Sequence, residues 1–171
     1  MARRTGLREF QLSVAERLRT ASTRTALSSK LGFQVGADNW FVALHQVSEV
    51  IPVPATVGVP LTHSWFRGVA NVRGNLYSVT DFSAFLGGEP TAAGEQARLL
   101  LINERFRSGA ALLVDRSLGL RDPGELEPRG DAGASQPPFV RAVFADGQGK
   151  LWKELDVAAL IQDQGFLEAS L

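Results

Sequence analysis

Residues 64–87 read SWFRGVANVRGNLYSVTDFSAFLG, and this stretch decides the fold. It contains two extended runs, Val69–Val72 and Asn75–Val79, which are separated only by Arg73–Gly74. Glycine accepts the backbone angles of a tight turn, so the runs predict a β-hairpin. A short helix is expected to follow from Asp81 to Leu86, where glycine stops it.

The rest of the chain also consists of short apolar runs that are separated by glycine, proline and polar turn residues. Many short strands with few helices indicate a mainly β protein built from barrels. Thr62–Phe66 is short enough for a single helical turn, and Asp156 can cap a last helix that runs to about Gln162. The other predicted strands are Leu31–Val35, Asn39–Leu44, Gln46–Val53, Arg98–Ile102, Ala110–Val114, Ser117–Leu120, Phe139–Ala145 and Lys150–Leu155.

The N-terminal segment differs from the rest in charge. Residues 1–30 carry seven basic and two acidic groups, a net charge of +5, while the remainder of the chain has a net charge of −5. Apolar residues recur within the segment at steps of three and four, as on an amphipathic helix. The segment is therefore predicted to be a basic helical arm. Its charged face can be solvated, or it can bind nucleic acid, anionic lipid or an acidic partner.

A second segment, residues 121–138, contains four prolines and three glycines. Both residue types interrupt helices and strands. The composition therefore predicts a mobile loop with no packed element.

The whole-chain composition excludes several classes of protein. The 171 residues, 44% of them hydrophobic, suit one domain or two small subdomains that pack together. The chain has no cysteine, which removes thiolate catalysis, cysteine-based zinc sites and disulfides. Its apolar runs are too short to cross a bilayer, and no apolar signal sequence follows the N-terminal arginines. A cytoplasmic protein without membrane insertion is expected.

The usual catalytic motifs are missing from the sequence. His45 and His63 lie apart and outside any metal-binding motif. Residues 147–150 read GQGK, but Leu151 stands where a phosphate-binding loop needs serine or threonine. No nucleophile elbow occurs, and the acidic residues are scattered. The sequence therefore predicts no enzyme, and no catalytic residue, metal or cofactor.

The order of motifs closely resembles that of CheW-like domains. In that family an aromatic turn and a glycine precede an Asn-x-Arg-Gly hairpin, a strand, an Asp–aliphatic pair and a short helix, as in residues 64–87. Val47–Val50 matches a Val-x-Glu-Val strand upstream, and Leu112–Asp115 matches a Val-Asp edge downstream. Leu155–Val157 is similar to the closing Leu-Asp-Leu. The resemblance extends from about residue 31 to residue 161.

This resemblance implies an architecture for the chain. A CheW-like domain is expected over residues 31–165, after the helical arm. It would consist of two small five-stranded SH3-like β-barrel subdomains, at about 31–90 and about 95–155. A closing helix would follow at about 156–163.

The resemblance also implies a function and a site. The protein would be a non-enzymatic scaffold that couples the cytoplasmic tip of a methyl-accepting chemoreceptor to the regulatory domain of a CheA-like histidine kinase. The hairpin arginine, Arg73, would pair with Glu49 at the groove between the subdomains and shape the receptor-facing surface. The partner-binding residues that follow from the resemblance are Glu49, Val50, Trp65, Phe66, Gly68, Asn71, Val72, Arg73 and Gly74.

Two segments point to one group within the family. They are similar to the corresponding segments of members that serve type IV pilus (twitching motility) systems, and they are the run from Trp65 to Ser78 and the ending Trp152–Asp156. This similarity implies a PilJ-like receptor and a position at receptor arrays of the inner membrane. A general flagellar adaptor is the alternative within the family. An alternative of another class is a small β-barrel that binds nucleic acid through the basic arm. The acidic body counts against it, and no nucleic acid is expected.

Three residues depart from the family pattern. His63 stands where proline is common, Ser78 replaces the usual proline before the aspartate, and Phe82 replaces leucine. None of them removes a catalytic group. They bear on the shape of the partner surface.

Overall fold

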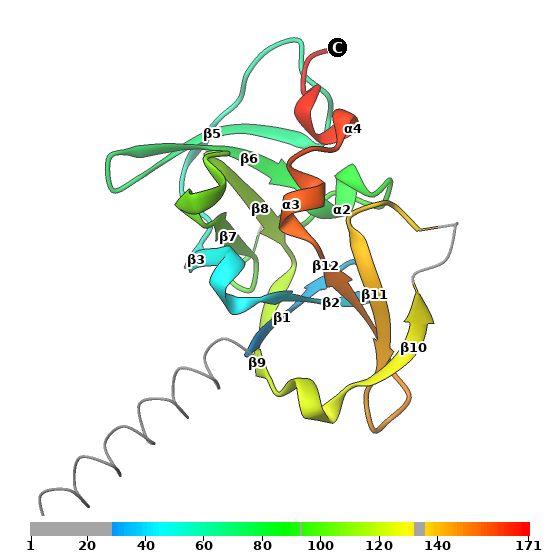
Figure 1. Ribbon diagram of the computed structural model, residues 1–171. Helices are drawn as coiled ribbons and strands as arrows, with labels where there is room; N and C mark the ends of the chain where they lie inside the picture. Colours follow the sequence, from blue (N-terminus) through cyan, green and yellow to red (C-terminus); the bar gives the residue numbers. More distant parts are fainter. Residues whose placement is uncertain (1–28, 93, 132–135) are drawn as a thin grey trace, which may run out of the picture.

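The computed structural model describes residues 29–92, 94–131 and 136–171 (Figure 1). Most of the predicted N-terminal arm, residues 1–28, lies outside the described residues, while Lys30 opens the first strand. Two six-stranded sheets account for about half of the described chain, and only short helices accompany them. The mainly β prediction is confirmed, with six strands in each sheet in place of the expected five.

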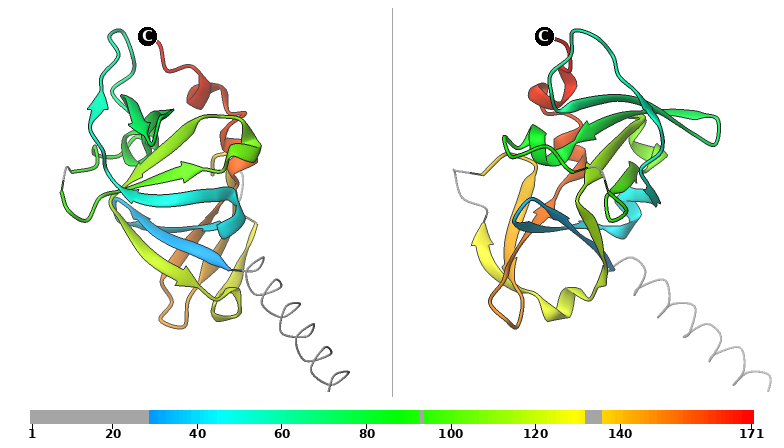
Figure 2. Two further views of the ribbon diagram at one scale, coloured as in Figure 1. Left: turned by 90° about the vertical axis from the view of Figure 1, so that its left-hand side faces the viewer. Right: turned by 180° about the vertical axis from the view of Figure 1, so that it is seen from behind.

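Sheet B, as we name it, is formed by one continuous part of the chain. Its strand order is β3-β7-β8-β6-β5-β4, and all neighbours are antiparallel except β6 and β8. The β5–β6 hairpin extends beyond the body of the sheet (Figure 2, right). The strands are β3 (Val47–Pro52), β4 (Thr56–Val57), β5 (Phe66–Val72), β6 (Asn75–Asp81), β7 (Arg98–Ile102) and β8 (Ala110–Val114).

Sheet A combines the start and the end of the described chain. Its order is β10-β11-β12-β2-β1-β9, and the parallel pairing of β12 with β2 joins its two parts. The strands are β1 (Lys30–Val35), β2 (Asp38–Ala43), β9 (Arg116–Arg121), β10 (Glu127–Asp131), β11 (Val140–Ala145) and β12 (Leu151–Leu155). The predicted division into subdomains at 31–90 and 95–155 is therefore wrong. The first hairpin belongs with the C-terminal strands, because Trp152–Leu155 pairs beside Asn39–Val42.

The helices within the described residues are all short. Aspartates cap three of them: the side chains of Asp81, Asp156 and Asp163 accept hydrogen bonds from backbone N–H groups in the first turn. The predicted caps at Asp81 and Asp156 are confirmed. The helices are α2 (Phe82–Phe85), α3 (Val157–Leu160) and α4 (Gln164–Leu167), with 3-10 turns η1 (Leu44–Gln46), η2 (Glu104–Phe106) and η3 (Pro123–Glu125).

The main core lies between the two sheets. Phe33 and Trp40 enter it from sheet A, Leu100 and Leu112 from sheet B, and Phe82 from α2. All five are at most 2% exposed, and the Trp40 and Phe82 rings meet edge to face with centroids 5.2 Å apart. The sheets therefore pack against each other through a shared aromatic core, on which α2 sits.

Two local predictions are wrong. Residues 121–138 contain strand β10 and turn η3, because Leu126 is buried against Phe41 and Trp152. Pro128 is compatible with this strand because β10 lies at the edge of the sheet. The single helical turn expected from residue 62 to residue 66 is also not formed. Residue 62 pairs there as an isolated β-bridge, and residue 66 begins β5.

Candidate functional site

The hairpin between β5 and β6 has a two-residue loop. Val72 pairs with Asn75, so only Arg73 and Gly74 lie between the strands. Both residues have positive φ, 52° and 90°, as the two central residues of a type I′ turn require. Asn71 Oδ1 accepts a hydrogen bond of 2.9 Å from the Gly74 N–H. Asn71 and Gly74 therefore fix the geometry of the turn that presents Arg73.

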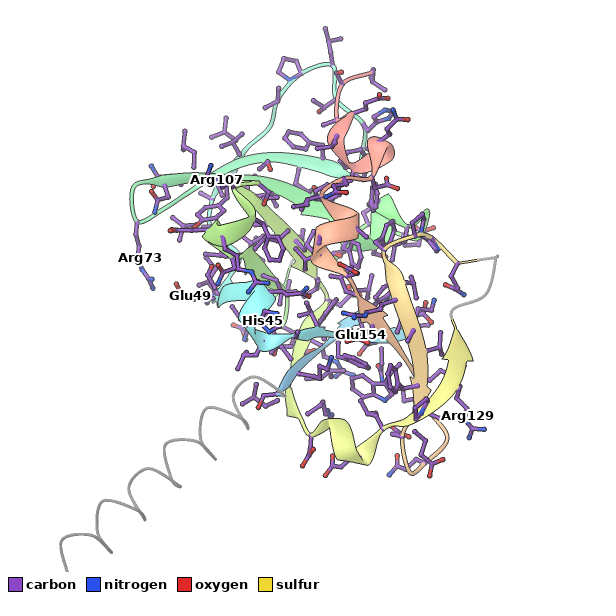
Figure 3. All side chains as sticks on the ribbon, viewed as in Figure 1. His45, Glu49, Arg73, Arg107, Arg129 and Glu154 are labelled. Carbon is purple, nitrogen blue, oxygen red and sulfur yellow. The ribbon has the colours of Figure 1, made fainter. Side chains whose placement is uncertain are left out.

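Arg73 and Glu49 form the predicted ion pair. Arg73 Nη1 lies 2.7 Å from Glu49 Oε2, and Arg73 Nη2 lies 2.7 Å from Glu49 Oε1. Figure 3 shows the arginine reaching down from the hairpin toward Glu49. The hydrogen bonds and negative charge of Glu49 raise the pKa of Arg73, so the guanidinium stays charged. The pairing is bidentate, which fixes the direction of both side chains.

A β-bulge directs Glu49 toward the hairpin. Val47 pairs with Ile102 and Glu49 with Leu101, so β3 contains one residue more than β7 between these two pairs. An extra residue in one strand bends it and re-aims the side chains that follow. The sequence motif predicted the partner of Arg73. It gave no sign of the bulge that brings the carboxylate into place.

The ion pair also joins two strands that are not neighbours. In sheet B, β3 lies at one edge, while β5 and β6 lie near the other edge. The backbone hydrogen bonds of the sheet therefore do not connect β3 with the hairpin. Glu49 and Arg73 bridge that gap with side chains, and the pair remains accessible, with side chains 36% and 73% exposed.

His45 is a histidine that the sequence analysis left without a role. It is exposed in η1, just before β3, and Figure 3 shows it below Glu49. Partial burial, together with the positive charges of Arg105 and Lys30, lowers the pKa of His45. The His45 imidazole is therefore harder to protonate than that of a free histidine.

Gly68 contributes to the surface only through its backbone. It is buried at a bulge in β5, with φ of 112°. A Cβ atom on Gly68 would lie 2.0 Å from the Val57 carbonyl oxygen. Any side chain here would push β4 away from β5. Gly68 therefore holds β4 in place and offers no side chain to a partner.

Trp65 and Phe66 lie at the opposite end of β5 from the turn. Trp65 is half-buried, stacks on His63 with ring centroids 5.6 Å apart, and meets Phe85 edge to face at 5.2 Å. Through Phe85 this cluster connects to Phe82 of the core. The indole is thus a partly accessible ring on a rigid support, the form of an aromatic anchor.

The predicted partner-binding residues therefore fall into two groups. We call Glu49, Asn71, Arg73 and Gly74 the hairpin end, and Trp65 with Phe66 the tryptophan end. Trp65 and Arg73 flank the seven residues of β5 and are about 25 Å apart along the chain at the rise of an extended strand. Val50 and Val72 are half-buried and pack against the two cores beneath the surface. The structure does not bring the nine residues into one cluster.

The three departures from the family pattern have structural roles. The N–H groups of His63 and Ser78 donate to the carbonyl oxygens of Ala169, at 2.9 Å, and Gly109, at 2.8 Å. A proline at either position would lack this donor. Phe82 fills the core with no exposed surface. The replacements thus support extra backbone contacts and a larger aromatic core.

The fold and the ordered motifs define a scaffold built on a CheW-like domain. The model of that domain family matches residues 30–165. The chain therefore belongs to the CheW-like domain family, and the predicted resemblance is confirmed.

Two known proteins are similar to this chain, one in sequence and one in fold. It is 33% identical over 149 residues to Protein PilI of Pseudomonas aeruginosa, an alignment that covers 84% of this chain and 80% of the relative. Its structure is similar to the crystal structure of scaffolding protein TtCheW from Thermoanaerobacter tengcongensis, with a TM-score of 0.65. That match covers 81% of this chain and 94% of the other at 19% identity, and we use it for the fold alone.

Two further findings concern chemistry and membranes. Among the residues that the structure describes, no group of three or more His, Asp or Glu side chains could hold a metal ion. Within the same residues, no helix is long and apolar enough to cross a membrane.

Proposed function

We propose that this protein is a non-enzymatic scaffold of a type IV pilus (twitching motility) chemosensory pathway. It joins the cytoplasmic tip of a PilJ-like methyl-accepting chemoreceptor to the regulatory domain of a CheA-like histidine kinase. The observation that carries the proposal is the bidentate Glu49–Arg73 pair on a two-residue turn. Receptor state then biases kinase activity because both partners are held on one rigid body.

The pair suits recognition better than stabilisation. An exposed ion pair adds little to folding stability, because water solvates both charges well in the unfolded chain. A bidentate pair on a fixed turn does, however, hold two opposite charges at defined positions. Such preformed charges select a complementary surface and speed its approach. The geometry at Arg73 therefore supports a receptor-binding role for the hairpin end.

The pilus pathway rests on a different observation, the 33% identity to Protein PilI. We place the protein in the cytoplasm, at receptor arrays of the inner membrane. Deleting the gene in its host should then reduce the twitching zone on agar and leave flagellar swimming unchanged. Loss of swimming taxis with normal twitching would instead indicate a general flagellar adaptor.

A three-component reconstitution tests the coupling. The receptor tip is immobilised, and the kinase regulatory domain is added with and without this protein. We expect retention of the kinase domain to depend on the protein, and we expect excess free receptor tip to abolish it. If the protein captures neither partner, the scaffold proposal fails. Equal retention without the protein would mean that the kinase domain binds the receptor by itself.

A further inference from the structure

The chain ends in a segment that lies partly beyond the family match. We call Asp163–Leu171 the strap. The match ends at residue 165, inside α4, and residues 168–171 follow the helix as a short tail. In Figures 1 and 2 the strap lies beside the loop between β4 and β5.

Backbone hydrogen bonds tie the strap to this loop. The His63 N–H donates to the Ala169 carbonyl oxygen at 2.9 Å, and the Leu171 N–H donates to the Leu61 carbonyl oxygen at 3.0 Å. Residues 62 and 170 form an antiparallel bridge between them. Leu61 has φ of 59°, a strained conformation for leucine, which persists only where neighbouring contacts hold it. Here those contacts include the hydrogen bond that Leu61 accepts from the strap.

A second connection runs through aromatic side chains. Phe166 of α4 is 8% exposed, and its ring meets Phe85 edge to face with centroids 5.5 Å apart. Phe85 in turn meets Trp65 at 5.2 Å. Asp163 caps α4 by accepting a 3.0 Å hydrogen bond from the Phe166 N–H, which holds Phe166 in place. The strap therefore supports Trp65 through the Phe85 ring as well as through the loop.

The strapped loop leads directly into the tryptophan end. The Phe66 N–H donates to the His63 carbonyl oxygen at 3.0 Å, so Trp65 lies inside a turn whose first residue is bound to the strap. On the other side, the Trp65 carbonyl oxygen accepts the Asp81 N–H at 2.8 Å. If the strap were released, Trp65 would keep its link to β6 and lose the support of the turn before it.

We propose that the strap positions Trp65 for receptor binding, so that residues outside the family's domain set the affinity of the tryptophan end. This inference rests on the proposed function, in which Trp65 contacts the receptor tip. The strap residues act through Trp65 and are positioning residues. Their own exposed side chains, including Leu171 at 80% exposure, need no contact with the partner.

A matched pair of variants isolates the backbone contact. Leu171→Pro removes the N–H that donates to Leu61, while Leu171→Ala keeps that N–H and removes the same exposed side chain. A chain that lacks residues 169–171 removes all of the backbone pairing. Since Leu171 contributes little buried surface, all three proteins should melt within about 3 °C of the wild type.

Collisional quenching measures the position of Trp65 without any partner. The chain has three tryptophans, and Trp40 and Trp152 are only 1% and 3% exposed, so acrylamide reports mainly on Trp65. Leu171→Pro and the truncated chain should be quenched about twofold more strongly than wild type, and amide exchange at His63 should accelerate about tenfold. Leu171→Ala should match the wild type in both measurements. Unchanged quenching and exchange in all three variants would overturn the positioning role.

Binding measurements connect the strap to the receptor. We expect Leu171→Pro and the truncated chain to bind the receptor tip about fivefold more weakly, with unchanged affinity for the kinase domain. Equal weakening by Leu171→Ala would show direct contact by the leucine side chain and contradict the proposal. If wild-type protein does not bind the receptor tip, the proposed function fails. Quenching and exchange then decide alone whether the strap positions Trp65.

Discussion

The two ends of β5 are held by different forces. At the hairpin end, the Glu49–Arg73 pair is exposed to water and rests on a two-residue turn. At the tryptophan end, Trp65 packs on Phe85 and hydrogen-bonds to the backbone of Asp81, whose side chain is fully buried. Exposed ion pairs add little to stability, while buried, fully bonded groups are costly to remove. One strand thus connects a surface held by exposed charges to a surface held by buried, hydrogen-bonded groups.

The largest loss of stability is expected for Asp81→Ala. Its carboxylate accepts hydrogen bonds from the Ala84 N–H and from both the N–H and the hydroxyl of Thr91, with no exposed surface. Removing it leaves these donors unpaired and should lower the free energy of unfolding by about 3 kcal/mol, measured with urea. Asp81→Asn keeps one acceptor and should cost less. A loss below about 1 kcal/mol for Asp81→Ala would contradict the contrast between the ends.

Phe85→Ala should cost somewhat less, about 2 kcal/mol, because this ring is only partly buried. It contacts Trp65, Phe82, Phe139 and Phe166, so its loss should also increase acrylamide quenching of Trp65. Phe85→Leu retains most of the volume and is the control. Wild-type quenching in Phe85→Ala would mean that Trp65 does not depend on the aromatic cluster.

At the hairpin end, Asn71→Ala should lower the free energy of unfolding by about 1 kcal/mol, because the Gly74 N–H loses its acceptor. Asn71→Asp keeps an acceptor and should be close to wild type. Chemical denaturation measures both variants. Amide exchange at Gly74 should be faster only in Asn71→Ala. Equal exchange rates would show that the two-residue turn is stable without this side chain.

A smaller effect is expected from pH. The pKa of His45 is lowered in the folded protein by burial and by Arg105 and Lys30, so the unfolded chain binds a proton more readily. Above the unfolded pKa of about 6.5, His45 is deprotonated in both states and does not reduce the free energy of unfolding. As the pH falls below that value, the unfolded chain takes up more protons and the free energy of unfolding decreases. Between pH 7.5 and 5.5, the melting temperature of wild type should fall slightly more than that of His45→Gln. Identical pH profiles would mean that His45 does not contribute.

The sequence motif was enough to predict the hairpin, the caps at Asp81 and Asp156, and the partner of Arg73, because each depends on residues close in sequence or on a recognised pattern. The assignment of the first hairpin to the C-terminal sheet could not be predicted. It depends on the parallel pairing of β2 with β12, which no local signal encodes. The separation of Trp65 from Arg73 was missed because both lie in one motif, whereas an extended strand holds its two ends apart.

The strap was missed for a related reason. Its contacts with Leu61 and His63 use backbone groups, which any residue except proline can supply. The buried Phe166 gave a local signal, an apolar residue shortly after Asp163, but α4 is only one turn long. A single helical turn shows no apolar periodicity that a sequence can reveal.

The smallest change in stability and the largest change in binding should coincide at Arg73. The most direct test is titration of the receptor tip by calorimetry into wild type, Arg73→Ala and Arg73→Lys, with urea unfolding of the same samples. We predict at least about tenfold weaker binding for Arg73→Ala, an intermediate loss for Arg73→Lys, which cannot form the bidentate pair, and unchanged unfolding midpoints. Wild-type affinity in a folded Arg73→Ala protein would contradict the assignment of the hairpin end to receptor recognition.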